Sequence, residues 1–361
     1  MHASRARREL APGSRIRVLV VDRSVVARRM LTHALETDPF IEVVGAASTG
    51  AVALQRIPQV NPDVLTLDLE MRDSEGMETL RKVRCLYPEM RVILISSSMQ
   101  RGAPDTLDAL AQGVDDYVSK PPREVRAGGE TAVLRGELVP KIRQFFRIAP
   151  ARTTGAQDLD HTARQPAGPS LGQAVLIGVS TGGPAALAAI LPSFPPNFPL
   201  PILVVQHMPA QFTRLLANRL SGLCPMPVVE AADGEPVPAG AVLLAPGDYH
   251  MRIQREGGRA VVRLDKAPPE NSCRPSVDVL FRTAGQVYGA GVLAAVLTGM
   301  GVDGLRGAAT LKALGATVLA QDEATSVVWG MPGAVVNAGL TDAILPLDSV
   351  VPEIIRRIRK S

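Results

Sequence analysis

Residues 175–184, VLIGVSTGGP, place one serine in a glycine-rich turn directly after an apolar run. Within this stretch Gly178 to Gly182 satisfy the pattern G-x-S-x-G, which presents a serine nucleophile when a strand runs into a helix. The stretch lacks the lysine of a P-loop, and its glycines fit a dinucleotide-binding turn poorly. The sequence therefore favours Ser180 as a nucleophile over a phosphate-binding turn.

A serine hydroxyl needs a neighbouring base, and that base needs an orienting acid. His207 follows the apolar run LPILVVQ and so has the same position relative to a strand that Ser180 has. His250 is the second candidate base, because it lies in a looser place a few residues past VLLAP. Asp303, which follows VLAAVLTGM, is the first candidate for the acid, and Asp248 is the second.

A second group of polar residues follows apolar runs in the N-terminal half, namely Asp22, Asp68, Ser96 and Lys120. The carboxyl ends of parallel strands meet at one edge of a sheet, so these side chains are expected to converge there. Such a group suits phosphoryl transfer to Asp68. Lys120 and a bound Mg²⁺ would counter the phosphoryl charge, and Ser96 would donate a hydrogen bond.

The elements that must position the N-terminal group alternate between strands and helices. Strands are expected at 16–21, 41–44, 64–68, 92–96 and 116–119, and helices at 25–36, 73–86 and 131–146. Five short strands with intervening helices predict a doubly wound α/β domain with a five-stranded parallel sheet over residues 15–148. Residues 1–14 are interpreted as a basic tail.

A second α/β domain is expected over residues 173–361. Between the two domains, residues 149–172 are rich in Ala, Pro, Gly and Thr without apolar periodicity, which is typical of a linker. After the linker, apolar runs resume and predict a mainly parallel sheet. A β-hairpin is expected at 251–265, where REGG resembles a turn.

Composition excludes several classes of protein. The chain of 361 residues is 46% hydrophobic, 20% charged and 3% aromatic, with a net charge of +4, which fits a folded protein and disfavours nucleic-acid binding. Its three cysteines are scattered, which argues against disulfides and against a zinc site. No segment resembles a signal peptide or reaches the about 20 apolar residues of a membrane span, so a cytoplasmic protein without direct membrane insertion is expected.

The motifs VLVVDRS, PDVLTLDLEM, VILISSS and DDYVSKP resemble, in order, the receiver domain of two-component response regulators. The resemblance implies that Asp68 is the phosphoacceptor and Ser96 the switch hydroxyl. It also implies that Lys120 is the active-site lysine and Tyr117 the switch aromatic. A histidine kinase is the implied partner.

This receiver-like stretch departs from the family pattern at its metal site. Arg23 follows Asp22 where the family has a second acid, Arg72 stands where proline is common, and Glu75 replaces an aspartate. Mg²⁺ tolerates missing oxygen ligands badly. Either Arg23 pairs with Asp68 and partly replaces the ion, or it points into solvent and Asp22 and Asp68 still bind Mg²⁺.

The motifs IGVSTGGP, VVQHMP, LAPGDYHM, RPSVDVLF, LTGMGVDG and VWGMPG together resemble the catalytic domain of chemotaxis-type protein-glutamate methylesterases. The resemblance covers nearly all of residues 173–361 and implies Ser180 as nucleophile, His207 as base and Asp303 as orienting acid. It places Thr181 and Met300 near the oxyanion, and it implies no cofactor for the esterase.

The implied reaction is hydrolysis of glutamate methyl esters on methyl-accepting chemotaxis receptors, with glutamine deamidation as a second activity. The resemblance also implies that the unphosphorylated receiver covers the esterase site and that phosphorylation opens it. Two alternatives stay open, namely a serine esterase for another substrate and a non-catalytic two-component adaptor.

Overall fold

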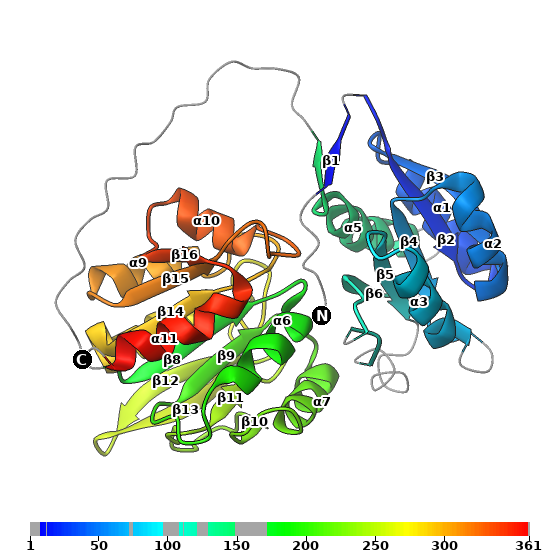
Figure 1. Cartoon of the computed structure of the whole chain (residues 1–361). Coiled ribbons are helices and arrows are strands. Elements are labelled where there is room, and N and C mark those ends of the chain that lie inside the picture. The colour runs from blue at the N-terminus through cyan, green and yellow to red at the C-terminus, as the bar shows by residue number, and fades with distance from the viewer. Residues whose placement is uncertain are drawn as a thin grey trace. The chain divides into compact units, whose positions relative to one another are not determined.

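The computed structural model describes residues 8–11, 13–71, 75–96, 108–110, 112–120, 129–148 and 172–359. These residues form two compact units, one from each half of the chain (Figure 1). Each unit has its own sheet and its own buried core. The expected linker, except for Gly172, and Arg72 lie outside the described residues.

The N-terminal unit contains a five-stranded parallel sheet in the order β3-β2-β4-β5-β6, the flavodoxin-like order. Its strands are β2 Ile16–Val21, β3 Ile41–Ala47, β4 Val64–Asp68, β5 Arg91–Ser96 and β6 Asp116–Ser119, and its helices are α1 Val25–Glu36, α2 Gly50–Val60, α3 Glu75–Leu86 and α5 Gly129–Arg143. Every residue of β4 and β5 is buried, as in a sheet with helices on both faces. The predicted doubly wound sheet is confirmed.

A separate pair of short strands lies at the two ends of this unit. β1 (Arg8–Leu10) pairs in parallel with β7 (Phe146–Ile148). The sequence predicts no strand within the basic N-terminal segment and predicts a last helix that continues to residue 146, whereas α5 ends at Arg143. A three-residue strand with mostly exposed side chains carries no periodic pattern that could reveal it.

The C-terminal unit contains a seven-stranded parallel sheet in the order β10-β11-β9-β8-β14-β15-β16. Its strands are β8 Ala174–Val179, β9 Ile202–Gln206, β10 Val228–Glu230, β11 Val242–Leu244, β14 Val292–Val296, β15 Thr317–Gln321 and β16 Ala343–Leu345. The central strands β8, β9 and β14 are buried throughout. The predicted α/β domain is confirmed. The apolar runs did not predict the two edge strands, β10 and β16, each of which is three residues long.

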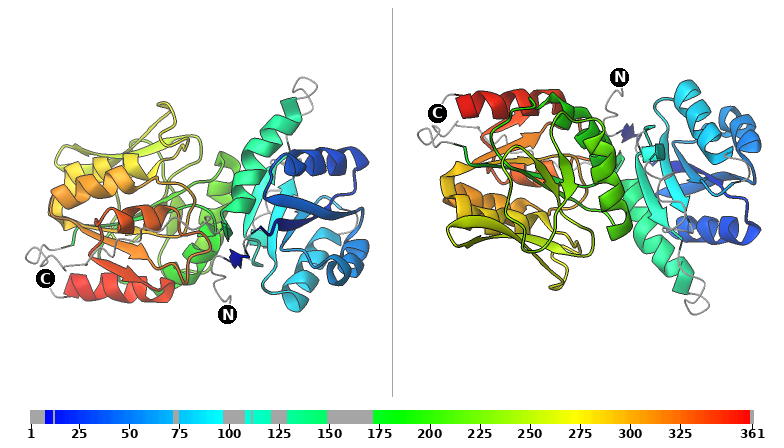
Figure 2. Two further views of the ribbon diagram at one scale, coloured as in Figure 1. Left: turned by 90° about the horizontal axis from the view of Figure 1, so that it is seen from above. Right: turned by 90° about the horizontal axis from the view of Figure 1, so that it is seen from below.

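Helices cover both faces of this sheet, with α8 and α9 on one face and α11 on the other (Figure 2). The helices are α6 Gly183–Ile190, α7 Ala210–Ser221, α8 Val277–Tyr288, α9 Leu305–Ala313, α10 Met331–Asn337 and α11 Val350–Arg359. The predicted hairpin is confirmed, since β12 (His250–Glu256) pairs antiparallel with β13 (Arg259–Asp265). Across the described ranges, no helix combines the length and apolar character that crossing a bilayer requires.

Close packing of α8 against α9 depends on Gly307. A Cβ built there would lie 2.6 Å from Phe281 Cβ and 3.1 Å from Asp278 Cα. The backbone N–H of Gly307 also donates to Asp278 Oδ1 at 2.6 Å, which joins the start of α9 to the start of α8.

We expect Gly307→Ala to destabilise the C-terminal domain by about 1–3 kcal/mol, because the added methyl group overpacks this contact. Arg306→Ala, an exposed change in the same helix, should stay within about 0.5 kcal/mol of wild type. Urea unfolding followed through the C-terminal domain transition measures both. Equal stability of the two variants would contradict the packing argument.

Candidate active site

Ser180, His207 and Asp303 lie beyond the carboxyl ends of three neighbouring strands. β8 runs between β9 and β14, and Ser180 comes directly after β8. The register pairs Val179 with Gln206, so Ser180 and His207 are the next residues on adjacent strands. Asp303 lies in the turn between β14 and α9. The sheet therefore brings the three predicted residues to one edge.

The turn around Ser180 requires glycine at two places. Gly182 has a φ of 78°, a left-handed conformation that starts α6. A Cβ on Gly299 would lie 2.8 Å from Ser180 Cβ, so a larger residue would displace the serine. The Ser180 N–H donates to Thr298 O at 3.0 Å, and the Gly183 N–H donates to Ser180 O at 2.8 Å. These bonds fix the serine backbone between β14 and α6.

Gln206, the last residue of β9, ties the serine turn to the histidine. Its Nε2 donates to Ser180 O and to His207 O, each at 3.0 Å. The side chain is buried, and a Cβ on Gly183 would come within 1.9 Å of its Oε1. Gln206 is not among the residues that the sequence predicts for the site. The sequence feature that could have revealed Gln206 is its position as a polar amide at the end of an otherwise apolar run.

Asp303 is buried and accepts hydrogen bonds from six donors. Oδ1 accepts from Asn271 Nδ2 at 2.8 Å, Ser276 Oγ at 2.8 Å, Asp278 N at 3.1 Å and Gly304 N at 3.1 Å, and Oδ2 accepts from Val277 N at 2.7 Å and His207 Nε2 at 2.8 Å. Burial by itself would raise the pKa of Asp303, but the bonds from His207, Val277 and Ser276 lower it to about 2. Asp303 is therefore a fixed negative charge.

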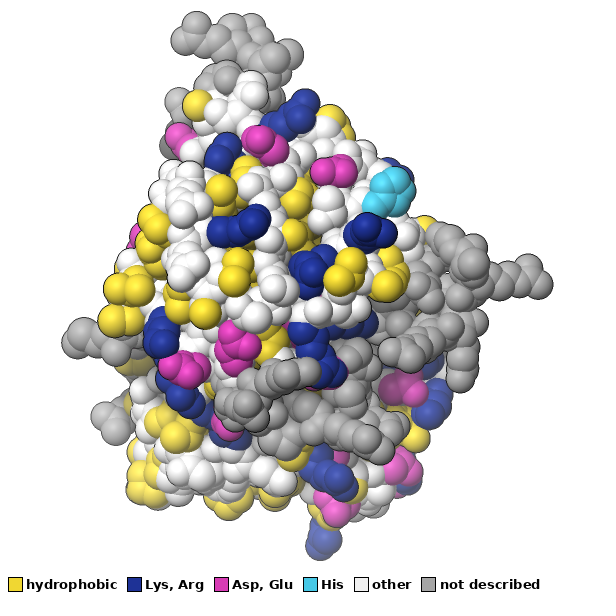
Figure 3. Space-filling view, turned by 90° about the vertical axis from the view of Figure 1, so that its right-hand side faces the viewer, with side chains coloured by type: hydrophobic (Ala, Val, Ile, Leu, Met, Phe, Trp, Pro, Cys, Tyr) yellow, Lys and Arg dark blue, Asp and Glu magenta, His cyan; other side chains and the backbone are white. Residues whose placement is uncertain are grey.

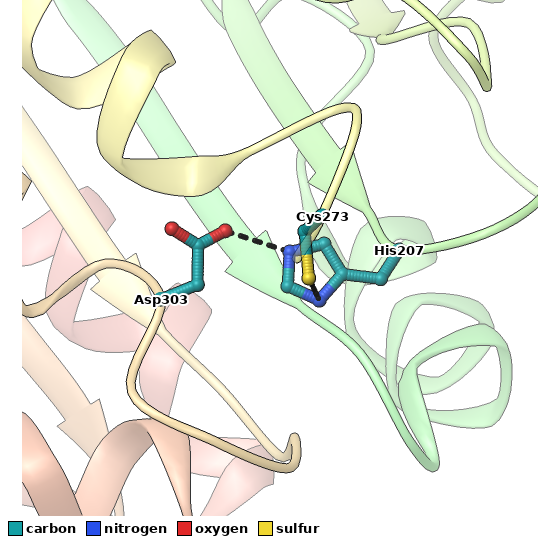
Figure 4. Close-up of side chains that lie close together, drawn as sticks. All are labelled: His207, Cys273 and Asp303. Atoms are coloured by element: carbon teal, nitrogen blue, oxygen red, sulfur yellow. Dashed lines mark hydrogen bonds and ion pairs between the residues drawn. The ribbon is translucent and has the colours of Figure 1, made fainter. Parts of the chain in front are cut away.

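His207 has contacts at both ring nitrogens (Figure 4). Nε2 faces Asp303 Oδ2 at 2.8 Å, and Nδ1 lies 3.5 Å from the sulfur of Cys273. Burial disfavours the charged ring, yet the hydrogen bonds with Asp303 and Cys273 raise the pKa of His207 to about 9. In this geometry the ring is an imidazolium at neutral pH. The sequence did not predict Cys273 as part of this site, because the three cysteines lie far apart along the chain.

No hydrogen bond joins the Ser180 hydroxyl to the His207 ring in the structure, although both residues are among those it describes. Catalytic hydrogen bonds are often long before substrate binds, so this does not exclude the pair. Because Asp303 engages Nε2, the nitrogen that remains for Ser180 is Nδ1, the atom that Cys273 now contacts.

His207, Cys273 and Asp303 offer ligand atoms within 4.8 Å of one another. A metal ion there would need a free carboxylate lone pair. Both oxygens of Asp303 already accept hydrogen bonds, so an ion would have to displace donors such as the Val277 N–H. The cluster is therefore poorly suited to holding a metal ion.

The second candidates from the sequence lie elsewhere. His250 is buried at the start of β12, and its Nε2 lies 3.1 Å from Pro268 O. Asp248 is half exposed and forms ion pairs with Arg274 and with Lys266. Of the candidate pairs, the structure brings together His207 and Asp303.

The two residues implied for the oxyanion flank the serine turn. Thr181 is buried, and its carbonyl accepts a hydrogen bond from Thr298 Oγ1 at 2.9 Å. Met300 is 39% exposed in the turn after β14, next to the Gly299 that packs against Ser180. Thr181 directly follows Ser180, and Met300 directly follows Gly299, so both residues adjoin the close contact between Gly299 and Ser180.

In the N-terminal unit, Lys120 joins the two predicted acids. Its Nζ lies 2.6 Å from Asp22 Oδ2 and 3.0 Å from Asp68 Oδ2. Burial and the Asp22 charge raise the pKa of Asp68, and Lys120 opposes them. The two carboxylates lie around one cation, and their oxygens are the ligand type that Mg²⁺ prefers.

The other predicted residues surround this group. Ser96 Oγ donates to Glu70 Oε1 at 3.2 Å, and the Glu70 N–H donates to Asp68 Oδ1 at 3.0 Å. The Tyr117 ring lies under Lys141 Nζ, 5.0 Å from the ring centroid. Burial raises the pKa of Tyr117. Glu70 is an acid outside the predicted set, although it follows Asp68 by two residues.

Arg23 is exposed, and among the described residues it forms no ion pair with Asp68. Of the two alternatives from the sequence, this placement matches the one in which Arg23 points into solvent.

Basic side chains are interspersed with acidic and hydrophobic ones over the face drawn in Figure 3.

The fold and these two sites define a receiver domain joined to a parallel-sheet α/β domain with a serine, a histidine and an aspartate at its strand ends. Residues 18–127 match the model of the response regulator receiver domain, and residues 175–354 match that of the CheB methylesterase. The chain is 46% identical to the protein-glutamate methylesterase/protein-glutamine glutaminase of Trichodesmium erythraeum, over 95% of this chain and 99% of that protein. It therefore belongs to the family of protein-glutamate methylesterases/protein-glutamine glutaminases.

Further comparisons give the same family. The namesake from a Nocardioides species is 47% identical over 96% of each chain. The crystal structure of the Thermotoga maritima CheB methylesterase catalytic domain is 45% identical and covers 53% of this chain and 99% of that one, with a TM-score of 0.50.

The His207–Asp303 pair makes stability depend on pH in a defined window. His207 has a raised pKa, so its contribution is complete below about 6.5 and is lost as the pH rises through about 9. Asp303 has a lowered pKa, so its contribution is present above 3.8 and is lost only as the pH falls through about 2.

We expect wild type to exceed His207→Gln in unfolding free energy most between pH 4 and 6.5, with the difference falling by about 3 kcal/mol toward pH 9.5. Urea unfolding of the C-terminal domain across this range measures the difference. His33→Gln, an exposed change in the other domain, supplies the baseline. A difference that stays constant from pH 5 to 9.5 would count against the charged pair.

Proposed function

We propose that the C-terminal domain hydrolyses glutamate methyl esters on methyl-accepting chemotaxis receptors, with Ser180 as nucleophile, His207 as base and Asp303 as the orienting acid. The observation that carries the proposal is the His207–Asp303 hydrogen bond of 2.8 Å at the strand end next to the Ser180 turn. The names of the relatives support the substrate class. Deamidation of glutamine on the same receptors is the second activity.

The proposed reaction begins when Ser180 Oγ attacks the ester carbonyl carbon and passes its proton to His207 Nδ1. Asp303 holds the Nε2 side of the ring and stabilises the imidazolium that forms. Backbone N–H groups near Thr181 and Met300 would stabilise the oxyanion, at about 3 kcal/mol each. Methanol leaves with the proton from His207, and water then releases the glutamate by the same route.

This reaction requires a change at His207. A ring that is already protonated cannot accept the serine proton, and Nδ1 faces Cys273. The ring becomes a base when it loses its proton and its Nδ1 turns to Ser180. Substrate binding beside the ring would favour the neutral form by removing water and by separating Cys273 from Nδ1.

We further propose that the N-terminal domain is phosphorylated on Asp68 by a histidine kinase. Asp22 and Asp68 would hold Mg²⁺, which supplies charge neutralisation for the transferred phosphoryl group. Lys120 would pair with a phosphoryl oxygen, and Ser96 would donate to another. Phosphorylation then controls the esterase if the aspartyl phosphate favours one of two states of the protein.

The test of the esterase is methanol release from methylated chemoreceptor membranes, with and without a small phosphodonor and Mg²⁺. We expect release from wild type to rise with the phosphodonor. Release should fall by at least about 10³-fold in Ser180→Ala, because the covalent step is lost. Ser193→Ala, the same change at an exposed serine, is the control and should match wild type.

Other outcomes of this assay distinguish the alternatives. Loss of release in Cys273→Ala together with retention in Ser180→Ala would make the thiol the nucleophile. Absence of release in every sample, with hydrolysis of a small ester, would favour another substrate. No hydrolysis at all would favour a two-component adaptor.

The exposed Arg23 gives a separate prediction for the receiver. Arg23→Asp should lower the Mg²⁺ concentration for half-maximal phosphodonor labelling of Asp68 by about tenfold, because an added acid next to Asp22 supplies a further ligand. Arg29→Asp makes the same charge change at another exposed position nearby and serves as the control. Equal shifts in both variants would show a general charge effect instead.

A further inference from the structure

Cys273 closes a tight two-residue turn next to His207. Glu270 and Cys273 exchange backbone hydrogen bonds, with the Glu270 N–H reaching Cys273 O at 3.1 Å and the reverse bond at 2.9 Å. Between them, Asn271 and Ser272 have φ values of 52° and 62°, as in a type I′ turn. These hydrogen bonds and φ values define the conformation of the turn. Because Cys273 is the last residue of the turn, they also fix the backbone that carries the thiol.

Side chains anchor the turn from two sides. Asn271 Nδ2 donates to Asp303 Oδ1 and to Asp278 Oδ2, each at 2.8 Å. Glu270 forms a two-pronged ion pair with Arg282 of α8, with both contacts at 2.7 Å. Cys273 is therefore held beside His207 by the same carboxylate that orients the histidine.

The electrostatics at this thiol differ from those at the other two cysteines. The Cys273 sulfur lies 3.5 Å from Nδ1 of His207, whose raised pKa makes the ring a cation at neutral pH. A positively charged neighbour is typical of reactive cysteines. By contrast, burial raises the pKa of Cys224 to about 11, and Cys85 is exposed on α3 of the other domain.

We propose that Cys273 is a modification site for small electrophiles, peroxides above all, and that its oxidation switches off the esterase. The second half rests on the function proposed above, whereas the reactivity of the thiol does not. Cys273 is partly exposed, and hydrogen peroxide is a small oxidant.

The chemical step balances with hydrogen peroxide as the oxidant. The Cys273 thiolate attacks one peroxide oxygen, so an S–O bond forms while the O–O bond breaks. The departing hydroxide takes the proton of the His207 imidazolium and leaves as water. Sulfur loses two electrons to the peroxide and becomes a sulfenic acid, which an added thiol reduces back by way of a mixed disulfide.

Oxidation would block catalysis for a geometric reason. The new oxygen is bonded to an atom 3.5 Å from Nδ1, the nitrogen that must accept the proton of Ser180. The sulfenic hydroxyl donates to that nitrogen and so takes up the lone pair that would accept the proton of Ser180.

The first arm of the test measures the alkylation rate of each cysteine in the full chain with iodoacetamide, by peptide mass spectrometry at neutral pH. We expect Cys273 to react at least tenfold faster than Cys85 in spite of its lower exposure. In His207→Gln the Cys273 rate should fall at least tenfold while the Cys85 rate is unchanged. Slow reaction of Cys224 in every sample reports that the domain remains folded.

Two results would overturn the proposal in this arm. One is a Cys85 rate equal to or above that of Cys273 in wild type. The other is a Cys273 rate that does not change in His207→Gln while Cys224 stays slow. Neither result depends on whether the protein is an esterase.

The second arm measures methanol release after treatment with hydrogen peroxide, each enzyme relative to its own untreated sample. Wild type should lose at least 90% of its release and recover it with dithiothreitol, and Cys273→Ser should lose little. Equal loss in both proteins would place the damage elsewhere. Fast alkylation without any methanol release in untreated wild type would overturn the proposed function and leave the reactive thiol standing.

Discussion

The esterase half of this protein depends on one buried carboxylate, Asp303, and on the donors that surround it. The start of α8 supplies two backbone N–H groups and the hydroxyl of Ser276, so the positive end of the helix dipole faces the negative charge. Without these donors a buried carboxylate would be protonated or expelled. Because they are present, the charge is fixed, and the β14 turn, the α8 N-terminus and the turn at 270–273 are joined at one point.

This constraint determines the state of His207. A fixed anion on Nε2 favours the protonated ring, and Cys273 adds to the effect on the opposite nitrogen. The contacts that orient the histidine ring therefore also favour its protonated form. The orientation of the ring and the availability of its unprotonated form are separate properties, because the hydrogen bond that orients the ring also raises its pKa. To act as the proposed base, His207 must first lose this proton and its contact with Cys273.

The sequence predicted the strands of both sheets within a few residues, because buried parallel strands are continuous apolar runs bounded by turns. It also predicted which residues stand at the strand ends. It could not predict Cys273, Gln206 or Asn271 as parts of the site. Cys273 and Asn271 reach His207 through a turn whose position depends on how α8 packs on the sheet, and no periodicity encodes that distance. The short strands β1, β7, β10 and β16 were missed for a related reason, since three residues are too few for a pattern.

The two sites place buried carboxylates at strand ends and give them opposite character through the number of donors. Asp303 accepts six hydrogen bonds, which lower its pKa and leave no lone pair for attack on a substrate. Among the residues that the structure describes, Asp68 accepts one backbone N–H and one ammonium, and burial raises its pKa. A less saturated carboxylate keeps a lone pair for a phosphoryl group or a metal ion. Within the described part of the chain, the donor count therefore separates a saturated carboxylate from a less saturated one, which position along the chain alone does not.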